Sequence, residues 1–165
     1  MIKSTSFIIV AAALACVAAG PARADTRAVA GTAFAHGDFN VAARRLLPLA
    51  ERGNARAQAM VGFMYATGQG LPQSYDAASY WYRRSADQGD TTAQYLLGLA
   101  YDKGQGVPQD DVAAYKWLNL AAAHAPRKTR ENFAKLRNAV ASKMSRGQIA
   151  AGQWHALRWP GESPF

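Results

Sequence analysis

Small and apolar residues recur along the middle of the chain at the spacing of a helix face. In residues 54–66 they include Ala57, Val61 and Tyr65, which stand four apart and predict a helix with one inward face. The pattern returns in residues 90–102. There it consists of Ala93, Leu97 and Tyr101. We therefore predict two equivalent helices.

A second kind of apolar stripe follows each of these helices. In residues 74–88 and 110–124, small residues surround a single tryptophan, Trp81 or Trp117. Such a stripe predicts a second pair of helices, packed through one large aromatic side chain among alanines and serines. With alanine common throughout, the chain is expected to be all-α.

The two helix pairs belong to one repeat. Residues 53–88 match residues 89–124 at 14 of 36 positions without a gap. A period of this length is typical of stacked helical hairpins. The repeated positions that we expect to be structural are Gly62, Tyr65, Gly68, Gly70, Pro72 and Trp81, followed by Gly98, Tyr101, Gly104, Gly106, Pro108 and Trp117.

A glycine loop joins the helices of each pair, "TGQGLPQ" in the first copy and "KGQGVPQ" in the second. Its glycines allow positive φ at the end of one helix, and its proline directs the chain into the next. Four residues are expected to cap the helix starts: Asn54, Ser74, Asp90 and Asp110. Because neither loop has a preceding strand, a third glycine or the Lys-Ser/Thr pair of a P-loop, we expect a corner and no ligand cradle.

Weaker units flank the two copies. Residues 25–52 predict an atypical N-terminal helix pair with a shorter turn at Gly37. After the second copy the period fails, and residues 125–159 predict two helices that cap the stack. Residues 160–165 are expected to form a loose tail.

The N-terminal segment, residues 1–24, has the pattern of a secretory signal peptide. Lys3 precedes an apolar run at 7–19, and small residues lead to a cleavage site after Ala24. This predicts a periplasmic or secreted protein without cysteines. An alternative stays open, because Cys16 in "ALAC" resembles a lipidation site that would tether the chain to a membrane.

Charge is concentrated at the C-terminal end. The formal net charge is +8, yet residues 25–124 contain nine basic and nine acidic residues. From residue 125 onward only Glu131 and Glu162 oppose eight basic residues. The eight are Arg127, Lys128, Arg130, Lys135, Arg137, Lys143, Arg146 and Arg158. Such a patch can attract an anionic surface, but the simpler explanation is an ordinary solvated helix face.

Catalytic patterns are missing from the sequence. His36, His124 and His155 stand in unrelated contexts and share no metal-ligand spacing with one another or with carboxylates. No nucleophile motif occurs, and we expect no enzymatic activity, metal or cofactor. Nucleic acid is not expected as a partner either, since the basic residues lack interleaved stacking aromatics.

The segment "AQYLLGLAYDKGQGVPQDDVAAYKWLNLAAA", residues 93–123, resembles the Sel1-like repeat family, a relative of the tetratricopeptide repeat. The copy at residues 57–89 resembles it with modest departures, such as Leu71 for valine and Ser74 for aspartate. The resemblance implies a right-handed α/α solenoid that serves mainly as a scaffold for protein–protein contact. It also implies that the first helix of each repeat lines the concave side.

From that geometry we predict a partner-binding stripe with apolar anchors and a basic rim. It consists of Arg56, Phe63, Thr92, Tyr95, Leu99 and Lys103. The alternative is that these side chains pack between repeats. The expected partner is a protein or peptide in the bacterial cell envelope. The competing interpretation is a structural protein that associates with an anionic envelope polymer or membrane surface through its basic C-terminal helices.

Overall fold

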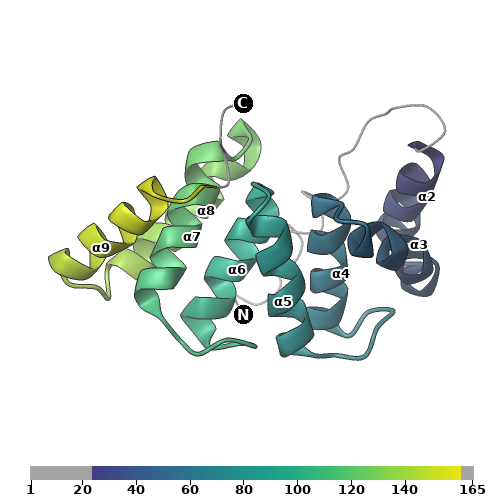
Figure 1. Cartoon of the computed structure of the whole chain (residues 1–165), viewed down its shortest axis with the longest axis horizontal. Helices are drawn as coiled ribbons and strands as arrows, with labels where there is room; N and C mark the ends of the chain where they lie inside the picture. The colour runs from purple at the N-terminus through teal and green to yellow at the C-terminus, as the bar shows by residue number, and fades with distance from the viewer. Residues whose placement is uncertain (1–23, 161–165) are drawn as a thin grey trace.

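The computed structural model of the chain describes residues 24–160, in which all regular structure is helical. The helices of this part are α2 (Ala24–Ala35), α3 (Phe39–Glu51), α4 (Ala55–Thr67), α5 (Tyr75–Ala86), α6 (Thr91–Lys103), α7 (Asp111–His124), α8 (Arg127–Ala141) and α9 (Arg146–Leu157). They stack along the long axis of the molecule, with α2 and α3 at one end and α8 and α9 at the other (Figure 1). The predicted signal segment, with Cys16, lies outside the described residues.

Two rows of helices alternate along the stack, and each row keeps a spacing of 36 residues. We call α4, α6 and α8 the A helices; they begin at Ala55, Thr91 and Arg127. The B helices are α3, α5 and α7, which begin at Phe39, Tyr75 and Asp111. Each of α5 and α7 packs against the A helix before it and the A helix after it. This alternation is that of an α/α solenoid.

The period extends one helix beyond the two similar copies. α8 begins 36 residues after α6, and its Phe133, 1% exposed, stands one period after the fully buried Leu97. A core position requires only an apolar residue of suitable size, so it persists where the glycines and tyrosines of the repeat are lost. The expectation that the period fails after the second copy is therefore wrong for the helix spacing.

The N-termini of α4, α5, α6 and α7 are capped by the residues expected from the sequence. The side chain of Asn54 accepts a hydrogen bond of 2.9 Å from the backbone N–H three residues later, and Asp90 does the same at 2.8 Å. Ser74 and Asp110 cap α5 and α7 in the same way. Each cap satisfies a backbone donor that the helix itself leaves unpaired, which fixes where the helix begins.

The first glycine of each loop ends an A helix, as predicted. Gly68 and Gly104 adopt left-handed backbone conformations, with φ of +71° and +65°. In each case the N–H of the glycine donates to a carbonyl of the last helical turn. The first glycine of each loop therefore makes the turn that ends the A helix.

The second glycine joins neighbouring units. Gly70 has φ of +74°, and a Cβ placed there would lie 2.5 Å from the carbonyl oxygen of Phe39, the first residue of α3. A Cβ on Gly106 would overlap the carbonyl of Tyr75, the first residue of α5. The hydroxyl of Ser79 also donates to the Gly106 carbonyl at 2.7 Å. We call this contact between a loop and the preceding B helix the loop clasp.

Within each unit a glycine lets the A and B helices approach closely. A Cβ on Gly62 would lie 2.6 Å from the ring of Tyr82, and one on Gly98 would lie 2.7 Å from Leu118. Tyr82 is 4% exposed and faces this glycine, whereas Trp81 is only half-buried. Trp81 still packs against the core, as predicted, but it is only partly buried, and the neighbouring tyrosine makes the contact with Gly62.

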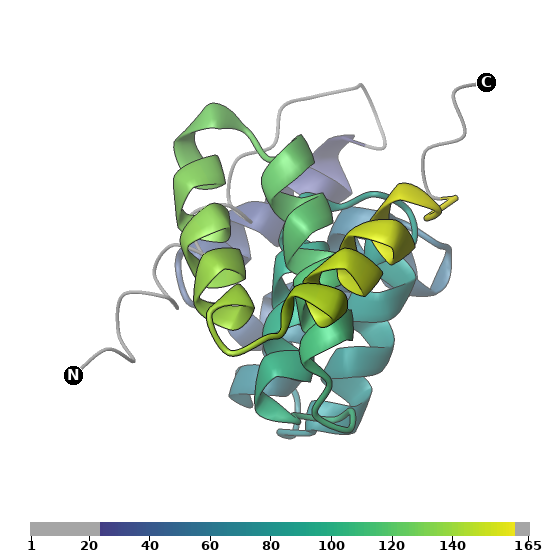
Figure 2. The same cartoon turned by 90° about the vertical axis from the view of Figure 1, so that its left-hand side faces the viewer.

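The two C-terminal helices occupy different places. α8 continues the row of A helices, while α9 packs on α7 and crosses it at the end of the stack (Figure 2). Gly152 permits this crossing, since a Cβ there would lie 2.8 Å from the ring of Tyr115. α9 begins with a capping box in which Ser145 and Gln148 exchange side-chain and backbone hydrogen bonds.

Candidate interaction surfaces

The predicted stripe on the A helices is largely interior. Phe63 is 5% exposed and packs edge-on against Phe34 of α2, with ring centroids 5.7 Å apart. Tyr95 is 7% exposed and stacks on Phe133 of α8 at 4.4 Å. Thr92 is buried as well. The prediction that Phe63 and Tyr95 are exposed anchors is wrong, since α2 packs on the first and α8 on the second.

The remaining members of the stripe are more accessible. Arg56 and Leu99 are half-buried, and Lys103 is exposed at the end of α6. Arg56 lies near Asp90, and its charge lowers the pKa of that carboxyl; burial acts in the opposite direction and prevails, so the pKa of Asp90 is raised overall. The structure therefore leaves a smaller, more polar stripe than the sequence predicted.

A second surface lies on α5, where we define the aromatic–cation patch as Tyr80, Trp81 and Arg84. The Tyr80 ring is 54% exposed and meets the Trp81 ring edge-on at 5.2 Å. The guanidinium of Arg84 lies 5.7 Å from the first ring and 5.5 Å from the second, and it donates to the Tyr80 hydroxyl at 3.1 Å. Large amphipathic rings beside a cation are typical of protein-binding surfaces.

Sequence reasoning missed this patch, although the sequence contains a signal for it. Tyr80, Trp81 and Tyr82 are consecutive in a helix, so they point in directions about 100° apart and cannot all face one interior. Because Tyr82 faces Gly62, its two neighbours turn away from that contact. An uninterrupted aromatic triplet on a helix is therefore evidence for an exposed ring.

The position on α7 that is equivalent to Trp81 is covered by other side chains. Trp117, one period after Trp81, is only 3% exposed. Its ring meets that of Trp159 edge-on at 6.2 Å, and the ammonium of Lys116 lies 4.2 Å from its centroid. Burial lowers the pKa of Lys116, and the attraction of Asp87 only partly opposes this effect. The ammonium of Lys116 thus lies in a partly desolvated place beside the covered Trp117 ring.

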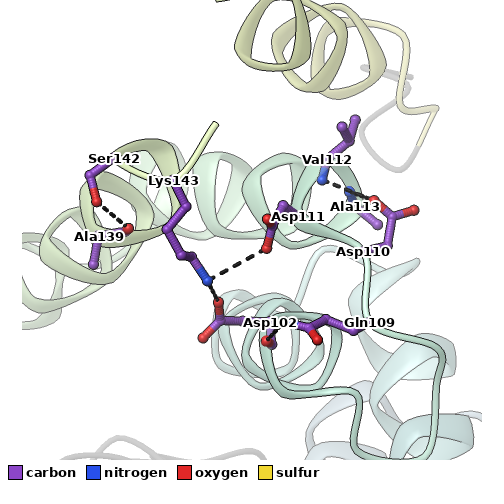
Figure 3. Close-up of polar contacts among 9 residues, drawn as sticks. All are labelled: Asp102, Gln109, Asp110, Asp111, Val112, Ala113, Ala139, Ser142 and Lys143. Atoms are coloured by element: carbon purple, nitrogen blue, oxygen red, sulfur yellow. Dashed lines mark hydrogen bonds and ion pairs between the residues drawn. The ribbon is translucent and has the colours of Figure 1, made fainter. Parts of the chain in front are cut away.

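Some of the basic residues in the C-terminal region stabilise the fold through ion pairs. Lys143, in the turn between α8 and α9, pairs with Asp102 at 2.5 Å and with Asp111 at 3.5 Å (Figure 3). These carboxylates come from the end of α6 and the start of α7, so one ammonium joins the terminal turn to the last repeat. We call this arrangement the terminal tie.

Other basic residues of this region divide between internal contacts and solvent. Arg130 donates to the carbonyl of Ala125, and Lys135 pairs with Glu131 at 2.8 Å on an exposed helix face. Arg127 and Lys128 are exposed at the start of α8. The predicted basic patch is therefore smaller than the charge count suggests.

Between residues 24 and 160 no three histidine, cysteine or acidic side chains are grouped closely enough to hold a metal ion. His36 lies in the connection between α2 and α3, whereas His124 lies on α7 and His155 on α9. In the same part of the chain, no helix is both long and apolar enough to cross a membrane.

Solved structures share this architecture. A protective antigen of uropathogenic Escherichia coli strains, described as displaying an SLR fold, aligns with a TM-score of 0.74 and 24% identity, over 85% of this chain and 30% of its own. A Sel1 repeat protein from Oxalobacter formigenes aligns with a TM-score of 0.63 and 25% identity, over 84% of this chain and 55% of its own. This chain thus spans about a third and about half of their lengths. A comparison with curated proteins finds no match.

The family comparison agrees with the helix rows. The model of the Sel1 repeat matches residues 55–90 and 91–125, which begin at the first residues of α4 and α6. Each match covers one A helix, one glycine loop and one B helix. Residues 55–125 are therefore two Sel1 repeats within an all-helical stack.

Proposed function

We propose that this protein is an exported, non-enzymatic scaffold that binds a protein or peptide partner in the bacterial cell envelope. Sel1 repeats typically mediate contacts between proteins, and this observation carries the proposal. The capped helices and loop clasps support it, because they hold exposed side chains on a preformed surface. A preformed surface loses less conformational entropy on binding than a flexible one.

The location rests on the sequence of residues 1–24. A basic residue, an apolar run and a small-residue cleavage site favour export, and the only cysteine of the chain lies within this segment. An exported domain without disulfides must keep its shape by packing alone. The close-packed A and B helices meet that requirement.

The proposal is tested by photo-crosslinking in living bacteria that produce the full chain. A photoreactive residue replaces Leu99 or Lys103 on the A-helix stripe, or Tyr80 on α5, and adducts are identified by mass spectrometry. Arg52, exposed in the α3–α4 connection, is the control position. We expect at least one surface position to capture a specific protein that Arg52 does not. Absence of such an adduct at all three positions contradicts a scaffold function.

A second candidate function is association with an anionic envelope polymer or membrane surface. Two observations favour it: Arg127 and Lys128 are exposed on α8, and α9 exposes Trp154 and Leu157 beside Arg158. Cationic and amphipathic aromatic side chains together suit an anionic interface. Salt-sensitive sedimentation with peptidoglycan or anionic vesicles, abolished by a combined Arg127→Glu and Lys128→Glu change, supports this function. Unchanged sedimentation of that variant contradicts it.

A further inference from the structure

One repeat position is open in the first copy and covered in the second. Trp81 and Trp117 stand 36 residues apart at the same place on α5 and α7. Trp117 is 3% exposed, whereas Trp81 is half-buried beside a Tyr80 ring that is 54% exposed. Because the helices that carry them are equivalent, the difference arises from what lies on top of each tryptophan.

Another aromatic side chain of this chain packs on Trp117. Trp159 follows the last turn of α9 in an irregular segment, and its ring meets Trp117 edge-on at 6.2 Å with the ring planes 73° apart. Edge-on aromatic pairs of this kind are favourable beyond the apolar area that they bury. The molecule itself thus shows how a short non-helical segment can close this repeat position.

A cation lies over the tryptophan ring at both positions. At the open position it is Arg84, whereas at the closed one it is Lys116, and the residue of α7 that is equivalent to Arg84 is Leu120, which is 5% exposed. In residues 24–160 no carboxylate forms an ion pair with Arg84, and Arg83 beside it adds a second exposed cation. A complementary ligand therefore needs an acidic group as well as an aromatic one.

We propose that the aromatic–cation patch on α5 binds a partner-protein segment that presents an aromatic side chain with a carboxylate beside it. The ring of the partner packs at Trp81 and Tyr80 as Trp159 packs at Trp117, and its carboxylate pairs with Arg84. The proposal rests on the proposed scaffold function and specifies its surface and the chemistry of its partner.

The direct test uses a defined peptide, acetyl-Glu-Trp-Pro-Glu-amide, titrated into the full exported chain to millimolar concentration. The chain contains four tryptophans, so their indole N–H signals can be followed separately by NMR. We expect a saturable shift of the Trp81 signal, no shift of Trp117, and loss of the effect when the tryptophan of the peptide is replaced by alanine. No saturable shift of Trp81, or a shift centred on Trp154, overturns the proposal.

Matched charge reversals separate local pairing from general attraction. Arg84→Glu changes an exposed residue of the patch, and Arg45→Glu makes the same change on the exposed face of α3. We expect the first to weaken peptide binding about tenfold and the second by less than about twofold, because distant surface charges are screened. Equal effects of the two variants overturn the proposal.

A third variant tests whether the packing of Trp159 on Trp117 is a guide to the packing of the partner ring on Trp81. Trp159→Ala removes the cover from Trp117, and the folded variant should then show a second peptide-dependent shift, at Trp117. Circular dichroism verifies that the helices are retained. If Trp117 stays unresponsive in a folded variant, Trp159 is no guide to the ligand, and the proposal is refuted.

Crosslinking distinguishes failure of this inference from failure of the scaffold function. An adduct at Leu99 but not at Tyr80 leaves the scaffold function standing and overturns the patch. Adducts at no position overturn both. A Tyr80 adduct supports the patch if mass spectrometry places the bond in a partner segment with an aromatic and an acidic residue. A Tyr80 adduct to a second copy of this chain overturns the proposed hetero-partner.

Discussion

The two Sel1 repeats have nearly the same helix bounds but different neighbours. α4–α5 lies between the N-terminal pair and the second repeat, whereas α6–α7 lies against the C-terminal helices. In the first repeat Phe63 packs on α2; in the second Tyr95 packs on α8. The B helices differ more, since Trp81 is half-buried and Trp117 is covered. The repeat determines the path of the backbone, and the place in the stack determines which side chains reach solvent.

The largest expected effect concerns the loop clasp. Gly106→Ala adds a Cβ that overlaps the Tyr75 carbonyl, and we expect it to lower the free energy of unfolding by about 4 kcal/mol or more. Gly70→Ala, whose Cβ would lie 2.5 Å from Phe39, should cost about 3 kcal/mol. Guanidinium denaturation measures both values.

Gly53→Ala is the control for backbone conformation in these clasp variants. Its φ is +89°, yet no atom lies within 4 Å of the added Cβ, so only the left-handed backbone is penalised, by about 1–2 kcal/mol. Similar losses for Gly53 and Gly106 would show that the clasp does not hold the units together.

The next prediction compares the two tryptophans. Trp117→Ala should lower the free energy of unfolding by about 3–5 kcal/mol, because it leaves a cavity under Trp159. Trp81→Ala should cost about 1–2 kcal/mol, since its ring already contacts water. Thermal and chemical denaturation report the difference. Equal costs would mean that the repeat, and not the neighbour, sets the burial of this position.

A smaller effect is expected at the terminal tie. Lys143→Ala removes the ammonium between Asp102 and Asp111, and because its side chain is 46% exposed the loss should be about 0.5–1 kcal/mol. Hydrogen exchange should become faster at the α8–α9 turn and at the start of α7. Lys128→Ala, on the exposed face of α8, should change neither quantity. Unchanged hydrogen exchange at the α8–α9 turn in Lys143→Ala would show that the terminal tie does not stabilise it.

The smallest expected change in stability comes from exchanging the N-cap residues of two A helices. Burial raises the pKa of Asp90 above its ordinary value of 3.8, so the folded state holds the proton more tightly than the unfolded state. Stability therefore falls as pH rises through and above that value. Asp90→Asn keeps a capping acceptor and should remove this fall, with a gain of less than about 1 kcal/mol at neutral pH.

The reciprocal change, Asn54→Asp, is the matched test in the first repeat. It should introduce a similar loss of stability with rising pH, measured by urea denaturation across the acidic range. A pH profile that Asp90→Asn leaves unchanged would contradict the role of Asp90.

Local features of the fold could be predicted because local chemistry determines them. A capping side chain such as Asn54 bonds to a backbone group three residues away, and Gly68 needs only its own positive φ. The capping residue and the glycine can both be recognised from a few consecutive residues of the sequence. The 36-residue spacing then identified the solenoid and the family.

Exposure could not be predicted in the same way. Phe63 and Tyr95 occupy the outward stripe of their helices, but Phe34 and Phe133, from units with little sequence likeness to the repeats, cover them. Trp81 was expected in the interior because Trp117 matches it, yet Tyr82 occupies the contact with Gly62. These outcomes depend on contacts between units, which a repeat alignment does not contain.

The loop clasp has a consequence for how such a chain can grow. Each 36-residue block carries both halves of the clasp: a loop glycine that faces the preceding unit and a helix start that receives the following loop. A copy of residues 53–88 inserted after Gln88 would place its own glycine on Tyr75 and offer its own tyrosine to Gly106. Duplication of whole blocks therefore creates a compatible joint on both sides, while an insertion that separates a loop glycine from the preceding helix start breaks one.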